Sequence, residues 1–466
     1  MAGIGFSIRR RLAKGTIRDF LAVYGLSALM GSGPWVISIA GLAFLGLAAG
    51  GIAQDRDVEI FFVSVTYAFG FSLVGTGALQ LLLSRCASDA CYQKARDRVG
   101  GIFLAGLISS MVISLIVGLC LFLWSYPGNF LAKVSAIALF PILGGIWSAI
   151  TFVSAQREFH VIAGIFMLGY ALSISLCWFI FQTLGGAYMM PGFVAGQVVL
   201  LALLVRSFHR EFDIAKAIDF SYLAQVKRYR ALVIGGFAYN AGIWIDKFIY
   251  WYASPFREHL GGVLFSCPIY DIPVYLSFLS IIPGMAIFLM KIETEFAFEM
   301  SEYLRLVEGK APIGVLEDRV GRIHRSVVDG LLAVVKVQGI VTLLLVCLTK
   351  PLLQNLSIGA LQAGIFQVTL IGAFLCVVFF CLLTVLFYLN RIREAAICAL
   401  VLLVANALLT ALNLRIGLQS YGSGFVAATG LSILCAYGYT QAALSELMYR
   451  TFATAPLGIY KSGDSS

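Results

Sequence analysis

Residues 239–252 read YNAGIWIDKFIYWY and place an acid beside a base, Asp246 and Lys247, inside a long apolar run. A charge at bilayer depth costs at least a few kcal/mol, so it usually faces the interior of a helix bundle or a water-filled cavity. The segment therefore predicts a membrane helix whose inner face has either a structural or a functional role.

A helical segment would arrange its polar and aromatic side chains on two stripes about 100° apart. The first stripe contains Asn240, Trp244, Lys247 and Trp251, and the second contains Tyr239, Asp246 and Tyr250. Amides, indoles and phenols suit a surface along which a hydroxylated substrate slides. The alternative is a structural Asp–Lys pair that holds two helices together, and the residues alone leave both interpretations open.

The composition of the whole chain indicates a membrane protein. Its 466 residues are 60% hydrophobic and 12% charged, and the mean hydropathy is +0.92. Soluble globular proteins have a charged fraction of about 25%. Runs of about 20 apolar residues recur along the chain, whereas the short alternating segments of a membrane barrel are absent. We therefore expect an all-α, polytopic membrane protein.

The apolar runs predict twelve membrane-spanning helices. Six lie in the first half, at residues 21–49, 60–84, 99–124, 132–155, 161–184 and 190–207. Six more lie in the second half, at residues 231–253, 267–290, 327–349, 365–389, 395–414 and 424–448.

The basic residues predict the orientation of these helices. Most of the 33 Lys and Arg residues fall in segments on the same side of the membrane as the N-terminus. Because cytoplasmic loops are enriched in Lys and Arg, both termini are expected in the cytoplasm. Residues 1–20 then form an amphipathic lead-in and residues 449–466 a cytoplasmic tail. The net charge of +9 reflects this topology, and no nucleic-acid partner is expected.

A polar segment at residues 208–230 divides the chain near its middle and predicts a cytoplasmic linker. It separates an N-terminal six-helix bundle, residues 21–207, from a C-terminal one, residues 231–448. An even number of helices in each half makes the halves parallel repeats, with the substrate expected between them. The Gly-x-Trp at residues 33–35 and the Gly-x-Trp at residues 242–244 occupy matching places, which supports a repeat.

The halves differ between their second and third helices. This segment is short in the first half, at residues 85–98, but in the second half it extends over residues 291–326. The longer segment predicts an amphipathic cytoplasmic helix, with a break at Ala311-Pro312. It either docks a partner or lies on the membrane surface.

The predicted helix at 267–290 contains three of the eleven prolines, namely Pro268, Pro273 and Pro283. Proline removes a backbone hydrogen bond and kinks a membrane helix. The kinks allow bending between inward- and outward-facing states, or they form a static bent wall. Asp271 and Tyr275 share one stripe of this helix. A rise of about 1.5 Å per residue places Asp271 and Asp246 at one level, in the outer half of the membrane and on neighbouring helices.

Two further polar residues lie at membrane depth. Lys336 lies near the middle of the predicted helix at 327–349, so the second half holds two acids and two bases at depth. Asn406 begins a stripe that continues at Thr410 and Asn413. Interhelical hydrogen bonding is favoured over ligand contact for such a stripe.

No motif for catalysis or cofactor binding is present. The chain has neither G-x-x-x-x-G-K-[ST] nor G-x-G-x-x-G. The ten cysteines lie mostly in apolar runs without a C-x-x-C pair, and the four histidines are scattered. No long extracytoplasmic loop carries an acid–base pair of the kind that a membrane ligase needs. We therefore expect no metal, no cofactor and no enzymatic activity.

The helix number, the repeat and the polar interface resemble the superfamily of MATE multidrug exporters and Wzx-like polysaccharide flippases. Three motifs resemble, more narrowly, the PelG-like inner-membrane transporters of exopolysaccharide. They are AGIGF at residues 2–6 followed by arginines, GSGPW at residues 31–35 and WIDK at residues 244–247. The similarity extends along the whole chain.

The resemblance implies a MATE/Wzx-like fold and transport of a cationic, partly de-N-acetylated hexosamine polymer toward the periplasm. It also implies partners: a cytoplasmic PelF-like glycosyltransferase, a PelD-like cyclic-di-GMP receptor and a PelE-like membrane protein, together with membrane lipid. Asp246 and Asp271 would attract an aminated sugar chain. Lys247 and Lys336 would repel it unless they are paired with those acids.

Our leading hypothesis is translocation of a Pel-type exopolysaccharide across the bacterial inner membrane, through the cavity between the bundles and within a synthase–transport complex. One alternative is a cation-coupled exporter of small molecules or lipid-linked oligosaccharides. Another is a membrane scaffold that anchors a glycosyltransferase through residues 291–326. The residues expected to line the pathway are Trp35, Tyr239, Asn240, Trp244, Asp246, Lys247, Asp271, Tyr275, Lys336 and Asn406.

Overall fold

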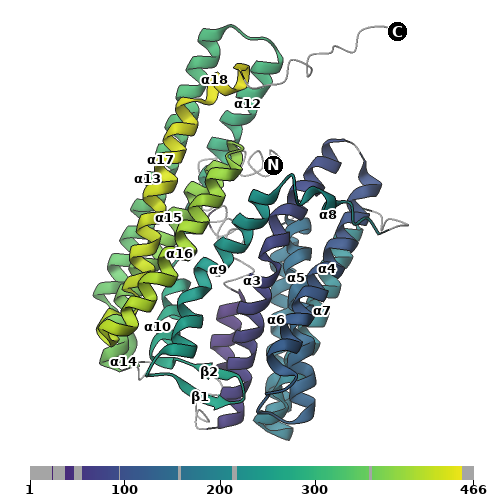
Figure 1. Ribbon diagram of the computed structural model, residues 1–466, viewed down its shortest axis with the longest axis vertical. Coiled ribbons are helices and arrows are strands. Elements are labelled where there is room, and N and C mark those ends of the chain that lie inside the picture. The colour runs from purple at the N-terminus through teal and green to yellow at the C-terminus, as the bar shows by residue number, and fades with distance from the viewer. Residues whose placement is uncertain are drawn as a thin grey trace.

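Helices account for almost all of the secondary structure in the computed structural model (Figure 1). The structure describes residues 24, 37–46, 55–93, 95–155, 159–212, 218–355 and 359–453. Within these ranges, one two-stranded sheet interrupts the helices. The expected all-α class is therefore confirmed.

The elements of the first half are α3 (Arg56–Tyr92), α4 (Arg96–Phe122), α5 (Phe130–Ala155), α6 (Phe159–Leu184), η2 (Gly186–Tyr188), α7 (Met189–His209) and α8 (Tyr222–Gln225). The second half begins with α9 (Arg230–Ala253), β1 (Glu258–Gly261), β2 (Leu264–Ser266), α10 (Pro268–Leu279), α11 (Ile282–Lys291), the π-helical η3 (Ile292–Phe296) and α12 (Ala297–Glu308). It ends with α13 (Ile313–Cys347), α14 (Thr349–Asn355), α15 (Ala360–Tyr388), α16 (Ile392–Ile416), η4 (Leu418–Ser420), α17 (Ser423–Ser445) and α18 (Leu447–Ala453).

Nine stretches in the described part of the chain are long and apolar enough to cross a membrane. They correspond to predicted helices two to six and eight to eleven. The seventh and twelfth predicted helices correspond to α9 and α17, which have 24 and 23 residues. Of the first predicted helix, the structure describes Tyr24 and residues 37–46.

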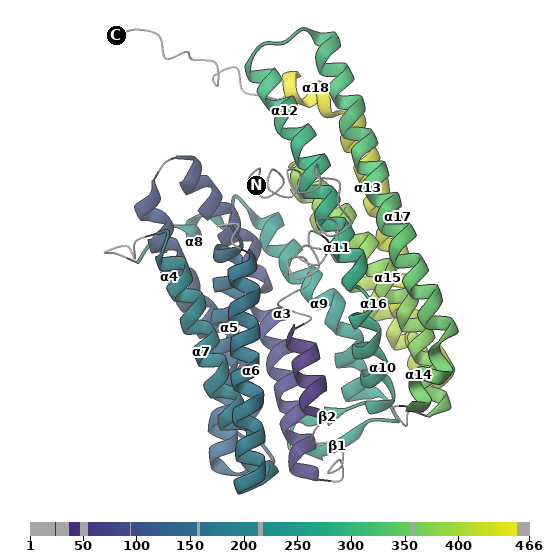
Figure 2. The same ribbon diagram turned by 180° about the vertical axis from the view of Figure 1, so that it is seen from behind.

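The helices form two groups that meet along α3 and α9 (Figures 1 and 2). Helices α3 to α7 pack on one another in the first group, and the second group contains α9 to α18. The β1–β2 hairpin lies at one end of the molecule, which we call the hairpin end. The α12–α13 turn and α18 lie at the other end, which we call the basic end because most Lys and Arg residues of the described ranges belong to elements there.

The eighth predicted helix is broken in the middle, between α10 and α11. Gln338 of α13, which is fully buried, bridges this break. Its Oε1 accepts a hydrogen bond from the N–H of Gly284 at 3.0 Å, and its Nε2 donates one to the C=O of Ser280 at 2.9 Å. Pro283 lies in the first turn of α11, where its missing N–H removes no helical hydrogen bond. One glutamine therefore satisfies one backbone N–H and one backbone C=O at the break.

Replacing Gln338 by Met is expected to lower the free energy of unfolding by about 1–3 kcal/mol, because a buried N–H and a buried C=O both lose their partner. Thermal unfolding of the purified protein in detergent measures the change. The matched control is Gln362→Met, at a half-buried site near the start of α15. Equal losses in the two variants would show that the bridge has no special role.

The linker between the two groups is held against the start of α4. The N–H of Asp219 donates to the C=O of Gly101 at 3.1 Å. The Asp219 carboxylate accepts hydrogen bonds from the N–H of Ser221 at 2.8 Å and from Nε of Arg98 at 3.3 Å. Partial burial raises the pKa of Asp219, but the hydrogen bonds from Ser221 and Arg98 outweigh it, so the net pKa lies below the ordinary value.

Replacing Asp219 by Asn is expected to destabilise the protein at pH 7 and to have no effect in strong acid. Because the folded-state pKa is depressed, the stabilisation is fully present above the unfolded-state pKa of about 4 and is lost as the pH falls through the folded-state value. Unfolding temperatures of both proteins between pH 7 and pH 3 should therefore converge. Asp318→Asn, which removes an exposed pair with Arg322, should show a smaller difference at every pH. A pH-independent difference for Asp219→Asn would contradict the expectation.

The amphipathic segment predicted at 291–326 folds as a helical hairpin made of η3, α12 and the start of α13. Its apolar side is buried, and Phe296 and Tyr303 belong to the same buried cluster as Ile323 of α13. The hydroxyl of Tyr303 also donates to Oγ1 of Thr451 in α18 at 2.9 Å. Helix α13 has 35 residues and a length of about 52 Å, which exceeds the hydrocarbon core of about 30 Å. The helical hairpin of α12 and α13 therefore projects beyond the other helices at the basic end (Figure 1).

Candidate functional site

The acid–base pair of α9 is buried where α9 meets α10. Asp246 is 1% exposed and Lys247 is 3% exposed. The Nζ atom of Lys247 lies 3.2 Å from both carboxylate oxygens of Asp246 and donates to the C=O of Ile243 at 2.9 Å. The hydroxyl of Tyr270 in α10 donates to Oδ2 of Asp246. The two opposite charges therefore compensate each other inside the protein, and the hydrogen bond from Tyr270 links α9 to α10.

A second buried acid, Asp271, lies in the first turns of α10. Its two carboxylate oxygens accept from Nε1 of Trp251 at 2.9 Å, and Oδ2 also accepts from the N–H of Cys267 at 2.9 Å. Cys267 is the N-cap of α10, and a carboxylate is favourable at a helix N-terminus. We call these side chains the buried charge cluster: Asp246, Lys247, Trp251, Tyr270 and Asp271.

Three aromatic rings surround the ammonium group of Lys247. The centroids of Trp244, Phe278 and Phe425 lie 5.9, 5.4 and 5.5 Å from Nζ. Aromatic faces attract a desolvated cation. Because Phe278 belongs to α10 and Phe425 to α17, the lysine joins three helices of the second group. This arrangement agrees with the structural interpretation of the Asp–Lys pair.

The same part of α9 also stacks on α3, the first described long helix of the opposite group. The rings of Tyr67 and Trp251 lie 4.7 Å apart at 9°, and those of Phe71 and Phe248 lie 4.3 Å apart at 8°. Such stacked pairs contribute about 0.5–1.5 kcal/mol each beyond the area that they bury. We call Tyr67, Phe71, Trp244, Phe248 and Trp251 the aromatic seam. Trp251 belongs to both the seam and the buried charge cluster, so the cluster is linked directly to the contact between the two groups.

Glycines let α3 and α9 approach closely. A Cβ atom added to Gly70 would lie 2.7 Å from the ring of Trp244. One added to Gly77 would lie 2.9 Å from the C=O of Gly236. Nearer the basic end, the hydroxyl of Tyr229 donates to Oδ2 of Asp89 at 2.9 Å. The two helices are thus in contact along most of their length.

The β1–β2 hairpin fastens the two groups at the hairpin end. It belongs to the second group by sequence, yet its hydrogen bonds go to the first. The hydroxyl of Tyr67 donates to the C=O of Phe265 at 2.9 Å, and Arg56 donates to the C=O of Leu260 at 3.1 Å. The N–H of Val263 donates to the C=O of Ser125, between α4 and α5, at 3.1 Å. The hairpin therefore forms a strap across the seam.

The predicted pathway residues occupy several places. Trp244, Asp246, Lys247 and Asp271 lie together in the cluster and the seam. Asn240 also faces α3, and its Nδ2 donates to the C=O of Gly236 at 3.2 Å. Tyr275 lies on α10 with its hydroxyl buried.

The other predicted residues lie away from the seam. Tyr239 packs on Phe379 and Phe380 of α15. Asn406 donates to the C=O of Gly242 at 2.9 Å and so joins α16 to α9. This is the interhelical hydrogen bonding that was predicted for its stripe. Lys336 is exposed on α13. Trp35 lies outside the described residues.

The sequence profile of the PelG family, described as exopolysaccharide exporters (EPS-E), matches residues 1–452. The chain belongs to the PelG family. Among curated proteins, none matches it in sequence.

Solved structures of MATE transporters share the fold of this PelG-family chain. An outward-facing MATE multidrug transporter of the MOP superfamily has a TM-score of 0.55 at 12% identity, over 91% of this chain and 96% of that one. An inward-facing MATE multidrug transporter of the MOP superfamily has a TM-score of 0.54 at 12% identity, over 92% of this chain and 95% of that one. A MATE protein in complex with MaD5 has a TM-score of 0.59 at 12% identity, over 91% and 96%. The family and the fold are those of multi-pass membrane transporters, so the expected PelG-like resemblance and MATE-like fold are confirmed.

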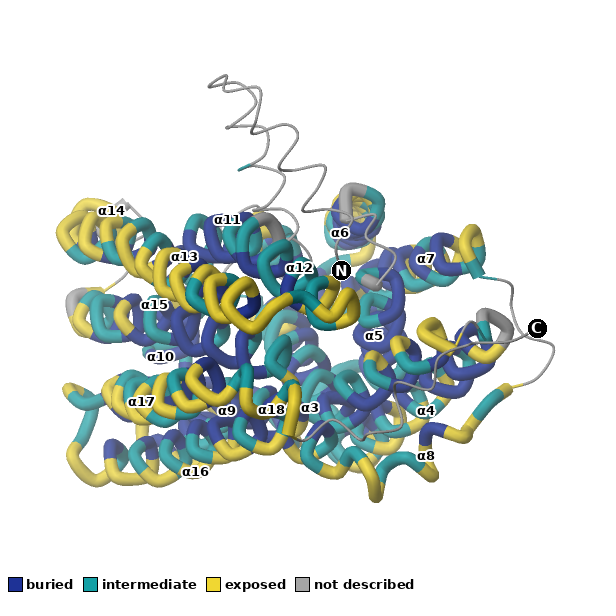
Figure 3. Tube along the Cα trace, turned by 90° about the horizontal axis from the view of Figure 1, so that it is seen from above, coloured by how far each residue is buried: buried dark blue, intermediate teal, exposed yellow. Residues whose placement is uncertain are grey.

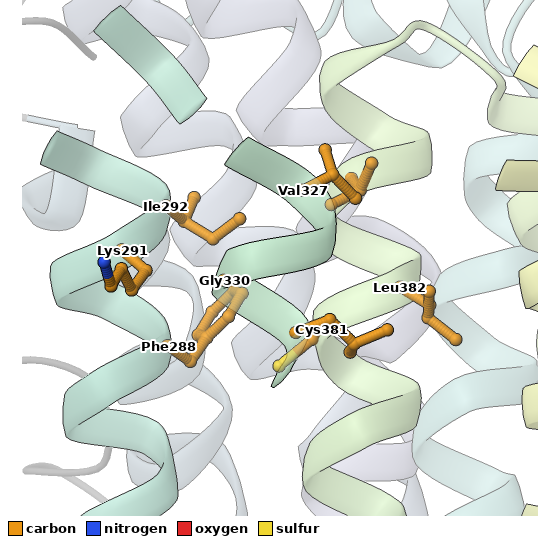
Figure 4. A pocket seen from close by; sticks show the side chains of 9 residues that line it. Phe288, Lys291, Ile292, Val327, Gly330, Cys381 and Leu382 are labelled. Atoms are coloured by element: carbon orange, nitrogen blue, oxygen red, sulfur yellow. The ribbon is translucent and has the colours of Figure 1, made fainter. Parts of the chain in front are cut away.

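A small pocket lies apart from the seam, between α11, α13 and α15 of this PelG-family chain (Figure 4). Its only charged lining residue, Lys291, pairs with Glu295. The others are Phe288, Ile292, Val327, Gly330, Leu331, Cys381, Leu382 and Val385. A site that binds a polar ligand usually contains several polar side chains or backbone groups that fix the orientation of the ligand. This small apolar pocket therefore does not suit a sugar.

The β1–β2 hairpin and the two rings of α3, Tyr67 and Phe71, were not predicted as parts of the site. Gly261 and Gly262 have positive φ values, +120° and +57°, and a Gly-Gly between apolar residues is a hairpin signal that was available. Tyr67 and Phe71 carried no comparable signal, because aromatic residues make up 13% of the chain.

Proposed function

We propose that this chain exports a Pel-type, amino-sugar-rich exopolysaccharide across the bacterial inner membrane, as the membrane channel of a synthase–transport complex. Its two bundles, residues 21–207 and 231–448, would move as bodies and expose a pathway between them to each side in turn. The basic end faces the cytoplasm with both termini, and the hairpin end faces the periplasm. The observation that carries the proposal is the aromatic seam with its hairpin strap, which joins the bundles at the hairpin end.

The seam supplies the gate in this mechanism. Polymer can leave toward the periplasm only when α3 and α9 separate near the hairpin, because the stacked rings occupy that contact. Once separated, the same rings present flat apolar faces to passing sugar rings. The buried charge cluster keeps α9, α10 and α17 together, so that they move as one body during separation.

The cluster has a positioning role in this proposal. Both oxygens of Asp246 already accept from Lys247, and both oxygens of Asp271 accept from Trp251. An aminated sugar therefore meets the acids only if the seam opens and these bonds are exchanged. The same pairing disfavours the alternative of a cation-coupled exporter with Asp246 or Asp271 as its ion site.

Cross-linking across the seam tests the proposed gate. Cysteines at Phe71 and Phe248, in a chain without its native cysteines, are joined by a short cleavable thiol reagent. Polymer export by cells is expected to fall to background and to recover after cleavage. The control retains only Cys398 and Cys435, whose sulfur atoms lie 3.6 Å apart on α16 and α17 within one bundle. Normal export by a fully cross-linked seam would refute the gate.

A second candidate function is the anchoring of a PelF-like glycosyltransferase. The projection of the α12–α13 hairpin beyond the other helices favours it. Deleting the hairpin tip, residues 304–316, should then release the glycosyltransferase from membranes, while substitutions in the seam should not.

A further inference from the structure

Helix α13 is the least covered of the apolar helices. In its most apolar 18-residue stretch, 22% of the residues are buried, against 39–72% in the other eight candidate spans of the described chain. Figure 3 shows a long exposed stripe on α13 at the rim of the molecule. At helical spacing, Leu332, Val335, Ile340 and Leu343 are all exposed on this side. We call this surface the outer face of α13.

Two charged residues interrupt the outer face. Asp329 and Lys336 are both exposed, and none of the ion pairs within the described ranges includes either of them. They are seven residues apart, so they lie on the same side of the helix and about 10 Å apart along its axis. The opposite side of α13 carries Gln338, which faces the break between α10 and α11.

Lys336 lies near the middle of the membrane. It is about 14 Å along the axis from Val327, where the predicted span begins, and about 16 Å from Cys347 at the end of the helix. An ammonium group that faces lipid at this depth is unfavourable, because it loses its hydration without gaining a counter-ion. Snorkelling lets a lysine near a helix end reach the interface, but a four-carbon stem is too short from mid-membrane. A carboxylate on a neighbouring helix would supply that counter-ion.

A second copy of this chain would not supply that carboxylate. Copies related by an axis along the membrane normal meet at equal depths, so Lys336 would face another Lys336. Asp329 of the second copy would be about 10 Å away along the axis. Lipids place their charges at headgroup depth, which is too far from Lys336 for a direct ion pair. Charge complementarity therefore favours a helix from a different protein.

We propose that the outer face of α13 is the docking surface for a membrane-spanning helix of a partner protein that carries Asp or Glu opposite Lys336. Apolar and small residues of that helix would pack on Leu332, Val335 and Ile340, since small residues allow close approach of membrane helices. A Lys or Arg two turns closer to the basic end would pair with Asp329. The proposal rests on the membrane complex of the proposed function, but its test measures contact between two proteins rather than polymer export.

The test places a photo-reactive amino acid at Leu332 of the full-length chain, in cells that express the complete export system. Irradiation is expected to give a cross-link to a second membrane protein. Mass spectrometry of the cross-linked peptide should identify a membrane-spanning helix with Asp or Glu within about one turn of the attachment site. The matched control places the same amino acid at Leu408, an exposed leucine of α16, where no cross-link to that helix is expected.

Charge reversal then tests the pairing itself. Lys336→Glu should reduce the cross-link at Leu332 at least tenfold, and changing the partner's acid to Lys should restore it. A cross-link only to lipid, to a second copy of this chain or to a helix without a mid-membrane acid would overturn the proposal. Two measurements together separate this proposal from the proposed gate. If the chain that is cross-linked across the seam loses export while the photo-cross-link at Leu332 still forms, both proposals are supported. If that chain exports normally while the photo-cross-link at Leu332 still forms, only the gate is contradicted.

Discussion

Replacing Asp246 by Asn alone is expected to destabilise the protein by about 3–5 kcal/mol, because the buried ammonium of Lys247 loses its counter-ion. The ammonium of Lys247 and the carboxylate of Asp246 lie 3.2 Å apart, and their side chains are only 4% and 1% exposed, respectively. Lys247→Met should cost a similar amount, since it leaves the Asp246 carboxylate buried without its cation. Thermal unfolding in detergent and the amount of folded protein in membranes measure both losses.

The double variant Asp246→Asn, Lys247→Met is expected to recover most of this stability, because it leaves no uncompensated charge. A double variant as unstable as either single one would contradict the ion-pair interpretation. The exposed pair of Glu302 and Arg305 gives the control, and Glu302→Gln should change stability little. Export by the stable double variant then separates folding from transport: unchanged export would remove both charges from the mechanism.

Replacing Gly236 by Val is expected to force α3 and α9 apart and to abolish export. An added Cβ atom at Gly236 would collide with the C=O of Gly77, and a backbone carbonyl cannot move aside as a flexible side chain can. Overpacking of this kind costs about 1–3 kcal/mol, occasionally more. Thermal unfolding and polymer export in cells measure the two effects.

Gly430→Val in α17 is the matched control, because a Cβ atom there would have no neighbour within 4 Å. Both variants add a β-branched residue inside a helix, so their intrinsic helix penalties are equal. A comparable loss in both variants would mean that helix propensity, and not the α3–α9 contact, explains the effect of Gly236→Val.

Most of the helix positions could be predicted from local patterns. The predicted span at 161–184 ends at the same residue as α6, and the span at 231–253 differs from α9 by one residue at its start. The prolines of 267–290 predicted a bend, and α10 and α11 are indeed separate helices. Which residue bridges the break was not predictable, because Gln338 is 54 residues from Gly284 in the chain.

The candidate site could be predicted only in part. Charge and depth placed Asp246 and Asp271 at one level on neighbouring helices, and the structure joins them to Tyr270 and Trp251. The pairing of Trp251 with Tyr67 could not be predicted, since it joins residues 184 positions apart among many aromatic residues.

By itself, the sequence determined that this chain crosses the membrane repeatedly as helices, and that its charges at depth belong to the second half. These are local properties: an apolar run of sufficient length must satisfy its own backbone hydrogen bonds in lipid, and a helix does so. Only the tertiary structure decided that the acids are already paired, that α3 stacks on α9 and that the hairpin straps the two groups together. Those contacts depend on how distant segments pack, and side-chain packing is specified by the three-dimensional fit of neighbours rather than by any single segment.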